Sequence, residues 1–129
     1  MRERKVLVVD DHYHITRPLA FMLKREGYTP LIARDGIDAV EVIDRELPGV
    51  VILDINMPRM DGWQLFDMLN GAPERYGGTA VIILSASAQE ADVERGMRLG
   101  ARDFIVKPFD PDELLRKIAQ CFESSAGNP

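Results

Sequence analysis

The stretch VVILDINMP, residues 50–58, decides the fold of this chain. Four apolar residues run directly into Asp54, and a short apolar run bounded by turn residues is typical of a strand buried inside a parallel sheet. Pro58 has no N–H to donate to a sheet ladder, so the strand should end near Asp54. In open α/β sheets, ligands bind outside the carboxyl ends of the strands. A carboxylate placed there is a metal ligand, a nucleophile or a helix cap.

Strand-like and helix-like segments alternate along the rest of the chain. The predicted strands are 5–9, 30–33, 50–54, 80–84 and 104–106. Apolar residues at helical spacing follow each of them, as Leu114, Ile118 and Phe122 do at the end. This alternation predicts a parallel sheet with right-handed crossovers and helices on both faces. We expect a flavodoxin-like (βα)5 domain with strand order 2-1-3-4-5 over residues 4–123, and a loose tail over 124–129.

Local signals predict where several helices begin. Asp35 and Asp110 each stand directly before a helical pattern and can cap it. Pro18 falls inside the first helical pattern. If that helix begins at Tyr13 or earlier, Pro18 lacks an N–H for a helical hydrogen bond and should kink the first turns. If it begins at 16 or 17, Pro18 is harmless.

Two further segments give weaker patterns. Residues 70–78 are rich in Gly and carry Asn and Pro, which is the composition of a loop. The helix expected after Ser87 is poorly amphipathic, with Gly96 inside it and Val93 and Met97 as its best apolar pair. Few buried contacts mean low local stability, so this helix is a candidate mobile element.

Bulk composition excludes several classes of protein. Hydrophobic residues make up 46% of the 129, so the chain is neither disordered nor membrane-embedded. No apolar run is long enough to span a bilayer, and no secretory leader opens the chain. Cys121 is the only cysteine, which suits a cytoplasmic protein. Lys and Arg number 16 against 21 Asp and Glu, and this net charge of −5 disfavours direct nucleic-acid binding.

Polar residues stand at the carboxyl ends of four predicted strands. Asp10 and Asp11 follow the first, Asp54 ends the third, Ser85 follows the fourth and Lys107 follows the fifth. These ends share one edge of a parallel sheet, so the three carboxylates should converge. Two carboxylates ~4 Å apart repel by about 4 kcal/mol at an effective dielectric of 20, so the cluster needs a cation. Oxygen ligands favour Mg²⁺, Mn²⁺ or Ca²⁺, and Mg²⁺ fits best with few protein ligands.

The same edge could hold a phosphoryl group. Lys107 supplies a positive charge and Ser85 a hydroxyl donor, which together with the metal would surround three phosphoryl oxygens. Phosphoryl transfer needs this positioning and electrostatic stabilisation and little else from the protein. Asp54 would then be the nucleophile and form an acyl phosphate.

The residues that carry a family resemblance stand at these strand ends and in the turns after them: Asp10-Asp11, Asp54, MPRMDG at 57–62, Ser85-Ala86, Gly100-Ala101 and FIVKPF at 104–109. Together they resemble a response-regulator receiver domain of two-component signalling, of the chemotaxis-regulator kind. The resemblance extends from residue 5 to about residue 122.

The resemblance implies a role for each matching acid. Asp54 would accept phosphate from the phosphohistidine of a sensor histidine kinase or a phosphotransfer protein. Asp11 and Asp54 would bind Mg²⁺ directly, together with the backbone carbonyl of Asn56. Asp10 would act through a metal-bound water. Mn²⁺ is a possible substitute for Mg²⁺.

It also implies how phosphorylation changes the surface. Ser85 and Lys107 would contact the phosphoryl oxygens, and the Lys107–Pro108 peptide bond would be cis. Phe104 would turn inward when the Ser85 hydroxyl moves toward the phosphate. The surface of the fourth expected helix, the fifth strand and the fifth helix would then change its affinity for an output partner.

Some features depart from the family pattern or allow a different interpretation. His12, His14 and Pro18 are not part of it, and Phe104 lacks the hydroxyl of a tyrosine, so its switching would rest on packing alone. The acid pair could simply cap a helix, and Lys107 could be a solvated surface residue.

Three other functions fit the sequence less well. A haloacid-dehalogenase-like phosphohydrolase would carry a second acid two residues after the nucleophile, where this chain has Asn56. A receiver-like module that is never phosphorylated would lack Asp54, the acid pair or the lysine. A nucleotide-binding domain would carry a glycine-rich loop after a strand.

We therefore expect a phosphoacceptor switch that catalyses only its own phosphorylation and dephosphorylation. It would be a monomer or weak dimer that binds neither nucleic acid nor membrane. It would act alone, by docking to another protein or relaying phosphate, or form part of a longer regulator.

Overall fold

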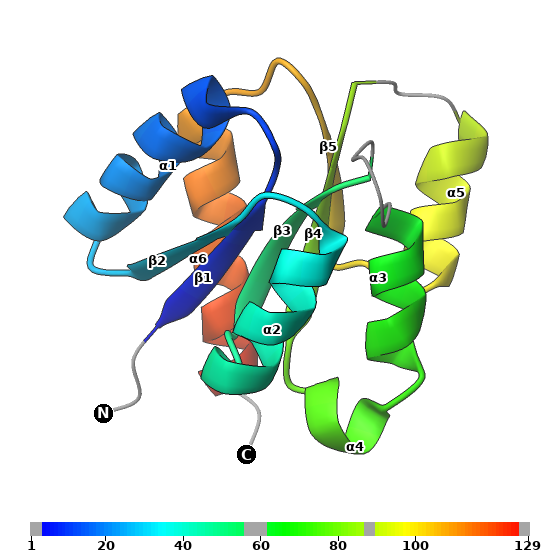
Figure 1. Cartoon of the computed structure of the whole chain (residues 1–129). Coiled ribbons are helices and arrows are strands. Elements are labelled where there is room, and N and C mark those ends of the chain that lie inside the picture. Colours follow the sequence, from blue (N-terminus) through cyan, green and yellow to red (C-terminus); the bar gives the residue numbers. More distant parts are fainter. Residues whose placement is uncertain (1–3, 56–61, 87–89, 127–129) are drawn as a thin grey trace.

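The structure is a computed structural model that describes residues 4–55, 62–86 and 90–126 (Figure 1). Its elements in chain order are β1 (Lys5–Val9), α1 (Tyr13–Arg25), β2 (Thr29–Ala33), α2 (Gly36–Glu46), β3 (Val50–Asp54), α3 (Gly62–Asn70), α4 (Pro73–Tyr76), β4 (Ala80–Ser85), α5 (Glu90–Arg98), β5 (Asp103–Val106) and α6 (Pro111–Ala126). In the described part of the chain, no helix has the length and apolar character needed to cross a membrane.

The five strands form one parallel sheet with the order β2-β1-β3-β4-β5. This confirms the predicted flavodoxin-like order, in which the chain winds outward in both directions from β1 and β3. Val9 of β1 pairs with Leu53 of β3, and Ser85 of β4 pairs with Val106 of β5. The last residues of these strands therefore lie level with one another at the carboxyl edge of the sheet.

Side chains of the central strands alternate between two cores, as the pleat of a strand requires. In β1, Val6 and Val8 belong to the core that includes buried residues of α1 and α6. Leu7 and Val9 belong to the opposite core, which includes buried residues of α2 and α3. Figure 1 shows the corresponding layers, with α1 and α6 on one face of the sheet and α2, α3 and α5 on the other. Because helices cover both faces of the sheet, the sequences of the central strands are continuous apolar runs.

The predicted caps at Asp35 and Asp110 are confirmed. The Asp35 carboxylate accepts a hydrogen bond from the Asp38 backbone N–H at 2.8 Å. The Asp110 carboxylate accepts one from the Asp112 backbone N–H at 3.0 Å. Each bond satisfies a backbone donor in the first turn of its helix. These contacts fix where α2 and α6 start behind the strands.

Two helices differ from the simplest expectation. Helix α1 begins at Tyr13, so of the two alternatives for its start the earlier one is observed, and Pro18 lies inside the helix. The segment predicted as a loop contains the short helix α4, with Pro73 at its first position. Tyr76 buries its ring in the core under α2 and α3 and donates a hydrogen bond to Asp44 of α2. This tertiary contact stabilises the single helical turn of α4, in a segment whose composition alone predicts a loop.

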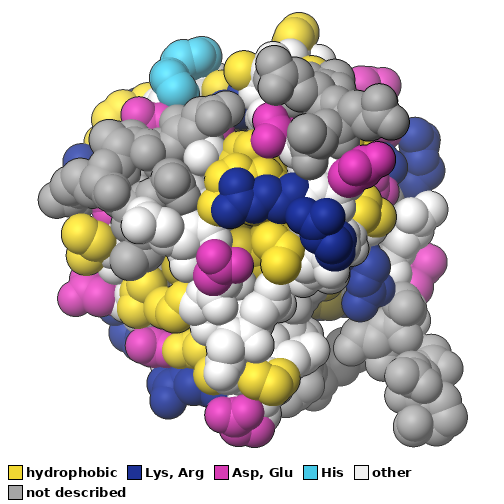
Figure 2. Space-filling model, turned by 90° about the vertical axis from the view of Figure 1, so that its right-hand side faces the viewer, with side chains coloured by type: hydrophobic (Ala, Val, Ile, Leu, Met, Phe, Trp, Pro, Cys, Tyr) yellow, Lys and Arg dark blue, Asp and Glu magenta, His cyan; other side chains and the backbone are white. Residues whose placement is uncertain are grey.

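Helix α5 makes little use of its best apolar pair, since Met97 is 49% exposed. Instead α5 approaches the sheet at Gly96, where an added Cβ would lie 2.8 Å from Ile83 Cδ1. The helix therefore packs through a residue without a side chain, which an apolar pattern cannot reveal. Beside this contact Arg95 lies 4.3 Å from the centre of the Trp63 ring. Figure 2 shows basic side chains against hydrophobic ones on this side of the molecule.

Candidate functional site

The site residues of β1, β3 and β5 reach the same place because of strand alternation. The core under α1 and α6 contains the residues two positions before each of them, namely Val8, Ile52 and Ile105. Asp10, Asp54 and Lys107 each lie two positions further along, so their side chains are on the same side of the sheet. The sheet register places Asp10 next to Asp54, because Val9 pairs with Leu53.

Lys107 lies between the two buried acids. Its Nζ is 2.9 Å from Asp10 Oδ2 and 3.1 Å from Asp54 Oδ2. Asp10 and Asp54 are each only 1% exposed, and the Lys107 side chain is 17% exposed. Charges this far from water are retained in a fold only when they are paired.

The lysine and the acids stabilise each other's charged forms. Burial on its own raises the pKa of the Asp10 carboxyl, but hydrogen bonds from Lys107 and His12 outweigh it and hold that pKa below the usual range. Burial likewise works to lower the pKa of Lys107, but Asp10 and Asp54 outweigh it and raise that pKa. Asp10 and Lys107 are therefore both charged at neutral pH.

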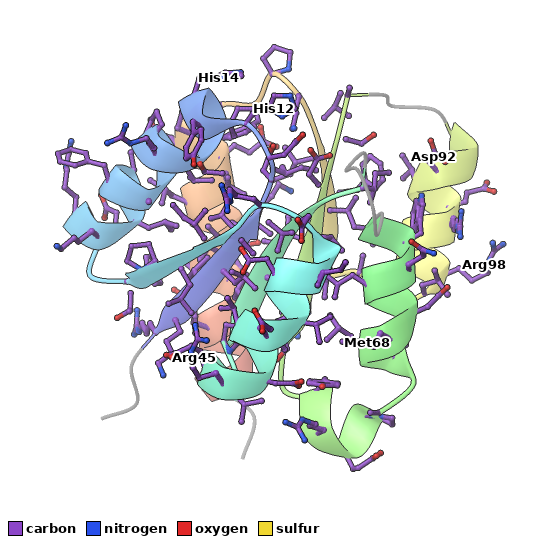
Figure 3. The ribbon with its side chains drawn as sticks, viewed as in Figure 1. His12, His14, Arg45, Met68, Asp92 and Arg98 are labelled. Atoms are coloured by element: carbon purple, nitrogen blue, oxygen red, sulfur yellow. The ribbon has the colours of Figure 1, made fainter. Side chains whose placement is uncertain are left out.

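Asp11 and His12 form the outer side of the same cluster. The His12 Nδ1 lies 2.8 Å from Asp10 Oδ1 and 3.1 Å from Asp11 Oδ1. The hydrogen bond with Asp10 is the main reason that the pKa of His12 is raised. His12 and His14 lie above the carboxyl ends of the strands, at the opposite end of the molecule from Arg45 (Figure 3). Sequence reasoning left His12 outside the site, although its position directly after the acid pair was the available signal.

Ser85 and Phe104 occupy the strands beside this cluster. Ser85 ends β4, is 1% exposed, and its carbonyl accepts a hydrogen bond from the Lys107 backbone N–H at 2.8 Å. The Lys107–Pro108 peptide bond is cis. Phe104 of β5 is partly buried against the core that contains α2 and α3. The predicted ligand Asn56 lies outside the described residues.

The donor set at this edge fits a small divalent cation. Among the residues that the structure describes, Asp10, Asp11, His12 and Asp54 each offer one ligand atom, and these atoms all lie within 4.8 Å of one another. Lys107 contributes one positive charge beside three carboxylates, so the cluster carries an excess of negative charge. Oxygen-rich clusters of this kind suit Mg²⁺ and Mn²⁺.

Comparison with known proteins gives a consistent result. The model of the response regulator receiver domain family matches residues 6–119. A curated relative named "Probable transcriptional regulator ycf27", from Porphyridium aerugineum, is 38% identical over 118 residues. That alignment covers 92% of this chain and 48% of the relative, so the chain spans about half the length of that protein.

Solved structures of similar fold are receiver domains too. The receiver domain of the Francisella response regulator 1452 has a TM-score of 0.85 and 30% identity, covering 95% of this chain and 99% of that one. A CheY-like response regulator receiver domain protein from Methanospirillum hungatei has a TM-score of 0.87 and 26% identity, covering 99% and 100%. Fold, sequence and the acid cluster agree. The chain belongs to the family of response regulator receiver domains, which act in two-component signalling.

Proposed function

We propose that this chain is a phosphoacceptor switch in which Asp54 takes a phosphoryl group from a phosphohistidine of a kinase or phosphotransfer protein. The observation that carries the proposal is the position of Lys107, within 3.1 Å of Asp54 and 2.9 Å of Asp10. A buried ion pair adds little to stability once desolvation is counted. A lysine held beside a carboxylate nucleophile does, however, stabilise the charge that builds up on phosphoryl oxygens.

The chemical step needs few groups. A carboxylate oxygen of Asp54 attacks phosphorus, the P–N bond to the donor imidazole breaks, and an acyl phosphate forms. The departing imidazole nitrogen keeps the electron pair of that bond and takes a proton from solvent. Lys107 contacts one phosphoryl oxygen, and the hydroxyl of Ser85 donates a hydrogen bond to another. In hydrolysis, water attacks phosphorus and the bond between phosphorus and the Asp54 oxygen breaks. Inorganic phosphate leaves and the Asp54 carboxylate is restored.

A divalent cation completes the site in this proposal. Asp11 and Asp54 would hold Mg²⁺ directly, Asp10 would act through water, and the main-chain carbonyl of Asn56 would be a further ligand. Mn²⁺ could take the same place. When bound, the cation neutralises negative charge shared by the carboxylates and the phosphoryl group.

The output of the switch would run through β5 and α5. We expect the Ser85 hydroxyl to move toward the phosphoryl group, which gives the Phe104 ring room to turn inward. A Cβ placed on Gly96 would lie 3.5 Å from Phe104 Cδ2, so the ring is close to α5. Its movement would therefore change the surface of α5, β5 and α6 and the affinity of that surface for an output protein.

The donor protein would dock beside the site. A groove of about 440 Å³ opens next to Lys107, between α1 and residues 107–111. Its walls are mostly apolar and include Ile15, Leu19, Met22 and Phe109. An apolar groove beside the phosphoacceptor supports approach of a partner helix from this side.

The first experiment is the intact mass of the protein after incubation with acetyl phosphate, with and without Mg²⁺, beside Asp54→Asn. We expect the mass of one phosphoryl group to be added to the wild type only, and only with Mg²⁺. The adduct should be stable in acid and labile in base, as an acyl phosphate is. An adduct on Asp54→Asn would contradict the choice of acceptor. No adduct on either protein would favour a receiver-like binding module that is never phosphorylated.

A further inference from the structure

We propose that His12 is a ligand of the cation at this site, so that the chain favours transition-metal ions over Mg²⁺ more strongly than a site of oxygen ligands would. The proposal rests on the metal site of the proposed function and adds a nitrogen to it. His12 takes no part in the mechanism derived above, and its role was left open by the sequence.

The geometry of the imidazole is the first argument. Its Nδ1 lies 2.8 Å from Asp10 Oδ1 and 3.1 Å from Asp11 Oδ1. In an octahedral site with metal–ligand bonds of about 2.1 Å, neighbouring ligand atoms are roughly 3 Å apart. Nδ1 therefore already has the spacing of an adjacent ligand to the oxygen of Asp11, a direct ligand in the proposed site. With Asp54 included, the four candidate ligand atoms still lie within 4.8 Å of one another.

The local backbone directs the ring to this place. His12 is the N-cap residue of α1, yet its side chain makes no capping hydrogen bond to the helix. Its backbone N–H instead donates to Asp10 Oδ1 at 3.0 Å. The ring also meets that of His14 edge to face, with the ring centres 5.3 Å apart. The ordinary role of a residue at this position, capping the helix, is thus not the one that His12 performs.

Ligand chemistry then predicts selectivity. Imidazole nitrogen suits Co²⁺, Ni²⁺ and Zn²⁺, whereas Mg²⁺ keeps to oxygen ligands and water. A nitrogen ligand therefore raises the affinity for Co²⁺ and Ni²⁺ and leaves the affinity for Mg²⁺ almost unchanged. The competing explanation is that His12 is only a positioning residue, which holds the two carboxylates by hydrogen bonds and never contacts the ion. In that case its loss should affect all divalent ions alike.

The test compares His12→Asn with His14→Asn in the whole chain. Asparagine is a favoured N-cap, so the first variant should keep the start of α1. The second removes an equivalent ring two residues away, which in the described part of the chain meets the His12 ring and shows no ion pair with the acids. The readouts are pulsed electron paramagnetic resonance of the Mn²⁺-loaded proteins, which detects nitrogen bound to the ion, and calorimetric titration with Mg²⁺ and Co²⁺.

We expect a nitrogen coupling in the wild type and in His14→Asn, and its loss in His12→Asn. The Co²⁺ affinity of His12→Asn should fall by about tenfold or more, since even outer-shell partners of metal ligands have effects of that size. Its Mg²⁺ affinity should stay within about twofold. Bound Mn²⁺ without nitrogen coupling in the wild type, or an equal loss for both ions, would overturn the proposal. Mg²⁺-dependent phosphorylation of Asp54 would still stand in that case, so the two proposals fail separately.

Discussion

At the carboxyl edge of the sheet Lys107 lies between Asp10 and Asp54, both 1% exposed. At the amino edge Lys117 of α6 meets Asp103 of β5 at 2.6 Å, with their side chains 24% and 34% exposed. The amino-edge pair joins one base to one acid and is partly exposed to solvent. Such pairs contribute about 0–1 kcal/mol to the free energy of unfolding. The carboxyl-edge cluster is buried and has more acids than bases. Its burial opposes stability, which is typical of groups retained for chemistry.

Replacing Lys107 by methionine should have the largest effect on stability. The stem of the side chain is kept, but two buried carboxylates lose their shared cation. Removing one partner of a buried pair costs about 3–5 kcal/mol, and the partial exposure of Lys107 places this variant near the lower end. Chemical denaturation in the presence of a chelator measures the loss. A loss no larger than that of Lys117→Met would show that the two edges do not differ.

Adding Mg²⁺ should stabilise the wild type by the next largest amount. An ion that binds only the folded state adds about 1.4 kcal/mol at ten times its dissociation constant. Thermal melting with increasing Mg²⁺ measures this gain. Asp54→Ala should lose most of the Mg²⁺-dependent shift, because it removes a proposed ligand, whereas Lys117→Met should keep all of it. No shift in the wild type, or a shift that Asp54→Ala keeps in full, would count against the cation site.

The carboxyl edge was the part most open to prediction from sequence. Val50–Asp54 is an apolar run that ends in an acid, and a parallel sheet brings all such ends to one edge. Strand order followed from alternation of strands and helices and from chain length. These features depend on local patterns and on topology, both of which can be read from a single sequence.

Long-range contacts between side chains could not be predicted in the same way. The short helix α4 depends on the hydrogen bond from Tyr76 to Asp44, 32 residues away in sequence. Helix α5 meets the sheet through Gly96, which gives no apolar signal. His12 joins the acid cluster through a ring orientation, and residue order alone does not determine that orientation. Each contact is tertiary, and tertiary contacts override local propensity.

Tyr76 of α4, just before the amino end of β4, offers a test that uses pH. Its hydrogen bond to Asp44, aided by burial, raises the pKa of the phenol above 10. The stabilising contribution is therefore full below the unfolded pKa of about 10 and is lost as pH rises through the higher folded pKa. Tyr76→Phe should melt a few degrees lower at neutral pH, and this difference should vanish in strong alkali. Spectrophotometric titration of the tyrosines measures the pKa directly. A difference between the two proteins that stays constant across this range would refute the assignment.

Lys117→Met should have the smallest effect, and salt should distinguish it from Lys107→Met. The Lys117 ammonium lies near solvent, and methionine is nearly as good a helix former, so the loss should stay below about 1 kcal/mol. Lysine is the better residue to change, because Asp103 also accepts the backbone N–H of Phe104 at 2.9 Å. At about 1 M salt the screening length falls to about 3 Å, so this small loss should nearly disappear. The loss in Lys107→Met should persist, since buried charges are screened far less. If salt erased both losses equally, the carboxyl-edge cluster would be as open to solvent as the amino-edge pair, and burial could not be what sets the site apart.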